Sequence, residues 1–164
     1  MEKVKSNRMI SLIDLYDMQS TFFNNVLDGI SDNDRHNRLN TPANHIAWLT
    51  GSMVEQRFDL ARVFGSDLKQ TADDFFRDNK GIQNDVIYPS LDVFREDWKK
   101  ITPVLKDLLV NVADEKLDST IEMMPGYSMT LYDISYFSSY REANCIGQIA
   151  LWRRLLGYEP MKYM

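Results

Sequence analysis

The sequence has 164 residues, of which 44% are hydrophobic and 26% charged, and this length and balance predict one globular domain over residues 1–164. The formal net charge of −5, with no basic stripe to offset it, repels a phosphate backbone, so we do not expect nucleic acid as a partner. One cysteine allows no intrachain disulfide, and no apolar run approaches the ~20 residues that span a bilayer. We therefore expect a cytoplasmic protein that does not bind membranes.

The first half of the chain predicts two long helices. Apolar residues recur at helical spacing from about residue 6 to residue 27, and Gly29 is a plausible stop. A turn-rich loop follows. For the second helix, Thr41 is the candidate N-cap and Pro42 the first helical residue, and the apolar pattern ends near Gly65.

The second half predicts two more helices. Ser90 is a candidate N-cap for the third, and Pro103 inside its pattern is expected to kink or split it. A loop follows, with extended pieces on either side of the turn at Pro125-Gly126. The fourth helix begins with capping-box spacing from Thr130 to Asp133 and runs to about residue 156. Four long amphipathic helices predict an all-α four-helix bundle.

Polar side chains interrupt one face of the fourth predicted helix. At 3.6 residues per turn, one stripe of that helix contains Ile134, Ser138, Arg141, Cys145, Gln148 and Trp152. The second helix has a comparable stripe, which contains His45, Trp48, Ser52 and either Glu55 or Gln56. Bundles build ligand and metal sites at such facing positions, so we expect the two stripes to face each other.

These stripes favour a binding pocket over a metal site. The chain has two histidines, His36 and His45, and His36 lies in a polar loop where we expect it to face solvent. A transition metal requires three or four ligands, and Arg141 would repel a cation, so we expect neither a metal nor another cofactor. Arg141 either faces the pocket and binds a carboxylate or phosphate, or lies on the surface and pairs with Glu142.

The single cysteine has two interpretations. Cys145 and Arg141 are helical neighbours, and a nearby guanidinium favours the thiolate, so both residues are candidates for catalysis. No histidine base is placed beside Cys145 by the sequence, however, and a buried, unreactive cysteine is the commoner case. We therefore favour a structural role for Cys145.

Two segments carry a family resemblance. Residues 141–148 read Arg-Glu-Ala-Asn-Cys-Ile-Gly-Gln, and residues 153–157 read Arg-Arg-Leu-Leu-Gly. They resemble the signature of the DinB-like (DinB/YfiT) superfamily, which reads His-Glu-Ala-x-His-x-Gly-Gln and then Arg-Arg-x-x-Gly. The second-helix run NHIAWLTGSMVEQR, residues 44–57, resembles the family's stretch that ends in Trp-Leu-x-Gly-His.

The resemblance implies an up-down-down-up bundle that is often dimeric. Members with intact sites bind nickel or zinc, and some act as thiol transferases, hydrolases or thiol-dependent isomerases. Here the two last-helix histidines of the family fall on Arg141 and Cys145, and the first falls on Ser52, or on His45 if the alignment slips. The metal site therefore looks degenerate, and the family's activity does not transfer with the fold.

We therefore expect a metal-free bundle that binds a small polar or anionic molecule or has a regulatory role. Its pocket would lie between the second and fourth long helices and contain Ser52, Arg141, Cys145, Gln148 and His45. Two other functions stay open. One is a thiol-dependent transferase or hydrolase that uses Cys145. The other is a structural or interaction homodimer, for which exposed apolar residues near the C-terminus, such as Met161, Tyr163 and Met164, are candidates.

Overall fold

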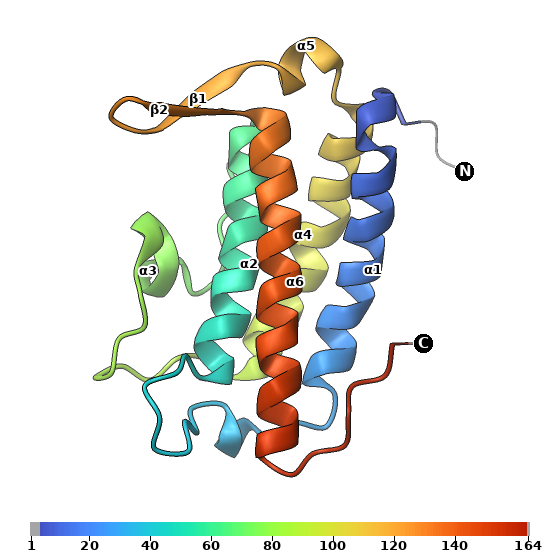
Figure 1. The fold of residues 1–164 in the computed structure, drawn as a ribbon. Coiled ribbons are helices and arrows are strands. Elements are labelled where there is room, and N and C mark those ends of the chain that lie inside the picture. The colour runs from blue at the N-terminus through green and yellow to red at the C-terminus, as the bar shows by residue number, and fades with distance from the viewer. Residues whose placement is uncertain (1–3, 164) are drawn as a thin grey trace.

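Four long helices form the body of the protein. The computed structural model describes residues 4–163, and its long helices are α1 (Ile10–Leu27), α2 (Ile46–Val63), α4 (Leu91–Asn111) and α6 (Leu131–Leu155). Both α1 and α2 pack against α4 and α6, so the four helices form a ring in which α1 and α2 lie on a diagonal. Figure 1 shows α1 and α6 running in one direction and α2 and α4 in the other. This is an up-down-down-up order.

Shorter elements connect these helices. Single-turn 3₁₀ helices span Asn7–Met9, Asp32–Asp34 and Arg77–Asn79, and short α-helices span Asp73–Phe76 (α3) and Asp114–Leu117 (α5). Strands β1 (Thr120–Met124) and β2 (Tyr127–Thr130) pair as an antiparallel hairpin on either side of Pro125-Gly126. The extended pieces predicted there are confirmed. The fold is therefore mostly helical with a small two-stranded sheet, and not strictly all-α.

The start of α2 differs from the prediction. The helix begins at Ile46 and not at Pro42, and its N-cap is His45, whose Nδ1 accepts a hydrogen bond from the Trp48 backbone N–H at 3.1 Å. The carbonyls of Pro42 and Ala43 instead accept hydrogen bonds from the Arg38 guanidinium at 2.5 and 2.7 Å. These bonds stabilise a loop at the positions where the capping signal predicted a helix.

The other helix ends follow their sequence signals more closely. α1 ends at Leu27, and Gly29 has a φ of +69° that favours glycine. The predicted capping box of α6 is confirmed, with the Thr130 and Asp133 side chains each bonded to the other residue's backbone N–H. Pro103, however, does not split α4. Proline has no N–H, so the Lys99 carbonyl, four residues before Pro103, loses its helical partner. Both residues lie on the exposed side of α4, where water can bond to that carbonyl.

The core fills the space between the four long helices. Trp98 and Trp152 are buried in it, as their apolar spacing predicts, and the Trp98 ring stacks on Phe23 with centroids 4.0 Å apart. Trp48 is only half-buried. Among residues 4–163, no helix combines the length and the apolar composition needed to cross a bilayer.

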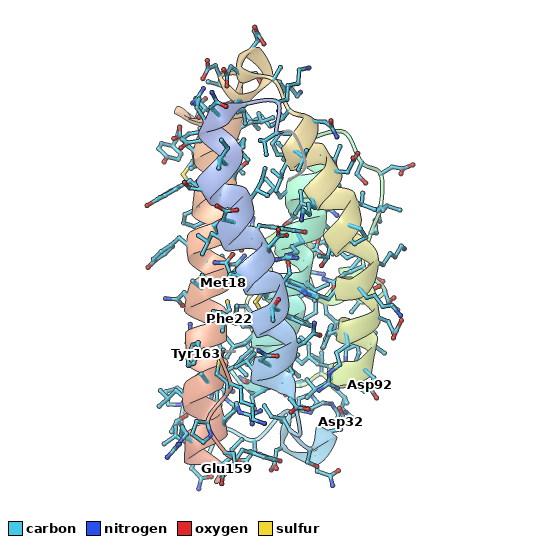
Figure 2. The ribbon with its side chains drawn as sticks, turned by 90° about the vertical axis from the view of Figure 1, so that its right-hand side faces the viewer. Met18, Phe22, Asp32, Asp92, Glu159 and Tyr163 are labelled. Carbon is cyan, nitrogen blue, oxygen red and sulfur yellow. The ribbon has the colours of Figure 1, made fainter. Side chains whose placement is uncertain are left out.

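The segment after α6 folds back along the bundle. Figure 2 shows Tyr163 beside Phe22 of α1, and the two rings meet edge to face with centroids 5.3 Å apart. Met161 is buried, contrary to the expectation of an exposed apolar end, whereas Tyr163 keeps most of its surface exposed. Met164 lies outside the described residues. The apolar C-terminal residues therefore serve partly to cover the bundle itself.

Candidate functional site

The polar stripes of α2 and α6 meet at Arg141. Its guanidinium donates from Nη2 to the Ser52 hydroxyl at 2.6 Å and from Nη1 to the Gln56 Oε1 at 2.9 Å. Gln56 in turn donates to the hydroxyl of Ser138 on α6 at 3.1 Å. These four side chains form a polar seam between α2 and α6. Ser52, Gln56 and Ser138 are buried in it, and Arg141 is half-buried. The structure thus brings together Ser52 and Arg141, which the two sequence stripes had placed opposite each other.

A small pocket of about 170 Å³ opens beside this contact. One wall comes from α2, one from the segment that follows α3, and one from Arg141. The lining residues are Trp48, Ser52, Glu55, Asp59, Phe76, Asn79, Lys80, Gly81 and Arg141. This volume is below the 300–1,000 Å³ typical of sites for drug-sized ligands, so it suits a small molecule or one end of a larger one.

The wall formed by residues 76–81 depends on a glycine in α2. The rings of Phe76 and Phe94 pack over Gly51 so closely that a Cβ at that position would collide with both. Gly51 therefore allows the end of α3 to pack closely over α2. Sequence patterns did not predict this wall, because it belongs to a polar connection without a recognisable motif.

The pocket lining also includes the acidic side chains of Glu55 and Asp59. Glu55 accepts hydrogen bonds from Arg62 at 2.8 Å and from Gln70 at 2.6 Å, and Asp59 also pairs with Arg62. Burial and the neighbouring Glu55 carboxylate raise the pKa of Asp59 to about 6, while Arg62 and Arg141 oppose this shift. The charge of the pocket therefore changes near neutral pH.

Two residues that line the pocket, Arg141 and Trp48, have donor capacity that the described residues leave unused. Among residues 4–163, Arg141 has no acidic partner within ion-pair distance. In the same part of the chain, the buried Nε1 of Trp48 has no hydrogen-bond partner. A buried N–H without an acceptor is costly, so a ligand or water that accepts a hydrogen bond is expected there.

Cys145, Gln148 and His45 do not line this pocket. Cys145 is buried, and burial raises the pKa of its thiol although the nearby Arg141 lowers it. The thiolate is therefore disfavoured. Gln148 is exposed and donates to Asn144 at 2.6 Å. Gln148 belongs to the same α6 stripe as Arg141, but its side chain is shorter and bonds to a residue of the same helix.

His45 lies at the start of α2, where its side chain caps the helix. Its ring meets His36 edge to face, with centroids 4.8 Å apart. His36 does not simply face solvent as expected, because it is half-buried and its Nε2 accepts the Tyr88 backbone N–H at 3.1 Å. Burial, with the neighbouring His36, Arg38 and Arg35, lowers the pKa of His45 to about 4. Both rings therefore serve as neutral acceptors for backbone N–H groups.

A buried ion pair next to Arg141 was not predicted. Glu142 pairs with Arg57 of α2 through two hydrogen bonds of 2.7 and 2.8 Å, and not with Arg141 as one interpretation proposed. The Arg57 side chain is fully buried, and its guanidinium lies 3.5 Å from the centroid of the Trp98 ring. Because Arg57 and Glu142 are far apart in the sequence, no local pattern predicts that they pair. The only available signal was that each of the two helices has a charged residue that falls on its buried side. The pair ties α6 to α2 beside the pocket.

The residues at the seam do not fit a transition metal. Among residues 4–163, no three His, Cys, Asp or Glu side chains gather into a group that could hold a metal ion. The positions that the family resemblance assigns to metal ligands carry Ser52, Arg141 and Cys145, and the guanidinium already bonds the hydroxyl. A cation would be repelled there, so this donor set does not suit nickel or zinc.

Comparison with known proteins gives no assignment. No family model matches the chain, and no protein of curated function matches its sequence.

Proposed function

We propose that this chain is a metal-free binding protein whose pocket takes the carboxylate, or another planar anionic group, of a small molecule. The observation that carries the proposal is the bonding of Arg141. Its guanidinium lines the pocket, and its two partners, Ser52 and Gln56, are both neutral acceptors. An arginine has more N–H donors than these two bonds use, and its planar fork suits a planar anion.

Other groups around the pocket favour the same ligand chemistry. The Trp48 indole N–H, which has no partner among residues 4–163, supplies a second donor, and Lys80 adds a positive charge to the lining. Ser52 holds the guanidinium at 2.6 Å, which restricts its orientation before a ligand arrives. Such preorganisation reduces the entropy lost on binding. Asp59 opposes an anion while it is ionised, so binding should depend on pH.

The proposal includes descent from a DinB-like metal site. Support comes from the up-down-down-up helix order and from the Ser52–Arg141 contact of 2.6 Å. Those two positions are ones that the resemblance assigns to metal ligands, and their contact is consistent with that alignment. A guanidinium in place of the metal keeps a positive charge at the seam while it removes Lewis-acid chemistry. The pocket would then retain affinity for an anion without the family's reactions.

The chain's three tryptophans provide the experiment. The indole N–H groups of Trp98 and Trp152 donate to backbone carbonyls at 3.4 and 2.8 Å, whereas that of Trp48, which lines the pocket with Arg141, has no partner among residues 4–163. Titration with formate, acetate or oxalate should therefore shift the Trp48 indole resonance in a ¹H–¹⁵N NMR spectrum. The resonances of Trp98 and Trp152 should stay in place as internal references.

Variants separate pocket binding from a general charge effect. Arg141→Met should abolish the Trp48 shift, and Arg141→Lys should weaken it, because an ammonium lacks the planar fork. Lys116→Ala removes one positive charge from an exposed site on α5 and should leave the titration unchanged. If Arg141→Met and the unaltered protein give the same Trp48 titration, Arg141 does not bind the anion and the proposal fails.

A further inference from the structure

A second pocket lies at the start of α2 and shares no lining residue with the pocket beside Arg141. Its volume is about 400 Å³, which is within the range of small-molecule sites. In Figure 1 the loop before α2 and the segment after α3 come together at this end of the bundle. The lining includes His36, Arg38 and His45 from the first of these, and residues 83, 84, 86 and 87 from the second.

Each histidine in this pocket has one ring nitrogen that the fold does not use. His45 accepts the Trp48 backbone N–H through Nδ1, and His36 accepts the Tyr88 backbone N–H through Nε2. An accepting nitrogen carries no proton, so a neutral ring carries its proton on the other one, which is Nε2 in His45 and Nδ1 in His36. Neither of these N–H groups has an acceptor among residues 4–163. His45 is only 5% exposed, so its unused donor is one that a ligand or water is expected to satisfy.

The charges and donors of the pocket favour an anion over a metal ion. A metal would require the lone pair of a ring nitrogen, and the two unused nitrogens carry protons instead. Burial lowers the pKa of both histidines, so the rings are uncharged at pH 7. Arg38 supplies a positive charge, and no Asp or Glu of residues 4–163 lines the pocket. The pocket also lies at the N-terminus of the 18-residue helix α2, where the helix dipole favours negative charge.

The arrangement of the donors suits a phosphoryl group. The two imidazole rings meet edge to face with centroids 4.8 Å apart, so one small group can contact both. Arg38 bonds two loop carbonyls and the Asn84 Oδ1, but a guanidinium has more N–H donors than these three bonds use. Donors on three residues require several acceptor oxygens, and a phosphoryl group presents three, whereas a carboxylate presents two in one plane.

The rest of the lining indicates that the phosphoryl group belongs to a larger molecule. The pocket is much larger than a phosphate ion, and Val86 and Ile87 contribute apolar side chains to it. Ile87 is 79% exposed, although a large aliphatic side chain is usually buried. An apolar part of a ligand would cover it.

We propose that the pocket at the start of α2 binds the phosphoryl group of a small phosphomonoester through N–H donors of His36, His45 and Arg38. Val86 and Ile87 contact the organic part of the ester. Because this pocket shares no lining residue with the pocket beside Arg141, the site does not depend on the function proposed above. The chain then has two separate sites for anionic groups.

The chain has two histidines, so the ring nitrogens of each can be followed by NMR. At constant ionic strength, a ¹H–¹⁵N spectrum of the free protein should show a protonated Nδ1 in His36 and a protonated Nε2 in His45. Titration with inorganic phosphate should shift both ring signals to saturation and leave the Trp98 indole signal in place. Phenyl phosphate should do the same with a lower Kd, because Val86 and Ile87 contact its ring. If neither histidine responds to either compound, the proposal is overturned, and weaker binding of phenyl phosphate than of phosphate would overturn the ester.

Two variants remove the proposed donors and keep the bonds that the fold uses. In His36→Gln the new Oε1 replaces Nε2 as acceptor, and in His45→Asn the new Oδ1 replaces Nδ1, so circular dichroism should show a folded protein. Each variant should raise the Kd of phosphate at least about tenfold, observed at the ring of the remaining histidine, because a hydrogen bond to a charged group is lost.

Controls separate this site from a general charge effect and from the other pocket. Lys116→Ala removes an exposed charge from α5 and should leave the phosphate titration unchanged. The Trp48 response to formate should persist in His36→Gln, so the two proposed sites can fail separately. An unchanged Kd for phosphate in both histidine variants would refute the assignment of the donors.

Discussion

Replacing Glu142 with glutamine is expected to lower the free energy of unfolding by about 3–5 kcal/mol, the usual cost of breaking a buried ion pair. The guanidinium is a positively charged group, and none of the Arg57 side chain reaches water. Without the Glu142 carboxylate, its charge would remain in the core without an anion to balance it. Glutamine has nearly the same shape as glutamate, so loss of packing contributes little.

The geometry of the pair sets where in this range the cost should lie. Two bonds of 2.7 and 2.8 Å form a bidentate contact, and the Glu142 side chain is only 4% exposed, so solvent screening is weak. Arg57 keeps its bonds to the Ser20 and Thr102 hydroxyls at 2.9 Å and its stacking on Trp98. These contacts offset part of the loss, so a value near 3 kcal/mol is expected.

Urea denaturation followed by circular dichroism measures this cost. The double variant Arg57→Met/Glu142→Leu should lose much less stability than the sum of its single variants, since it leaves no unpaired charge. Arg8→Ala removes an exposed partner of Asp118 and should cost little stability, because solvent screens the pair. The reasoning is refuted if Glu142→Gln destabilises the protein as little as this surface variant.

Three further predictions follow from the pKa shifts. In an NMR titration, formate should bind more tightly at about pH 5 than at about pH 7.5, because Asp59, with a pKa of about 6, loses its negative charge at the lower pH. Asp59→Asn should remove this difference. An unchanged pH dependence in that variant would contradict the role of Asp59. Urea denaturation should show stability falling as the pH decreases from about 6.5 to about 4, because His45 takes up a proton more readily in the unfolded chain than in the fold. His45→Asn, which keeps a capping oxygen, should reduce that fall, and an equal fall in both proteins would refute it. Iodoacetamide should label Cys145 slowly in the native protein and with an apparent pKa above that of a free thiol, because burial disfavours the thiolate. Rapid labelling at neutral pH would restore the thiol chemistry that the sequence left open.

The sequence was most informative where structure depends on neighbouring residues. Periodic apolar positions predicted four long helices, and the capping box at Thr130 predicted the start of α6. The start of α2 could not be predicted in this way, because the Arg38 guanidinium binds the carbonyls of Pro42 and Ala43 and stabilises a loop there. A local capping signal does not include such competing bonds.

The part of the candidate site that lies on α2 and α6 could be predicted from helix periodicity. The wall that covers it could not. The spacing of Ser52 and Arg141 on their helices was enough to place them opposite each other, since 3.6-residue periodicity fixes each stripe. The wall around Phe76 depends on close packing over Gly51, which no spacing rule reveals. Helix periodicity also gave Gln148 the same direction as Arg141, but only the longer side chain reaches α2.

At the seam between α2 and α6, we assign a positioning role to Glu142 and the proposed binding role to Arg141. Both oxygens of the Glu142 carboxylate accept hydrogen bonds from Arg57, so we expect this pair to restrain the position of α6 along α2. A shift of α6 along α2 would move the Arg141 guanidinium away from Ser52, which it now contacts at 2.6 Å. If the ion pair sets the register, Glu142→Gln should weaken anion binding as well as stability, although Glu142 does not line the pocket. A variant that loses stability but keeps the Trp48 titration would show that the buried pair and the pocket are independent.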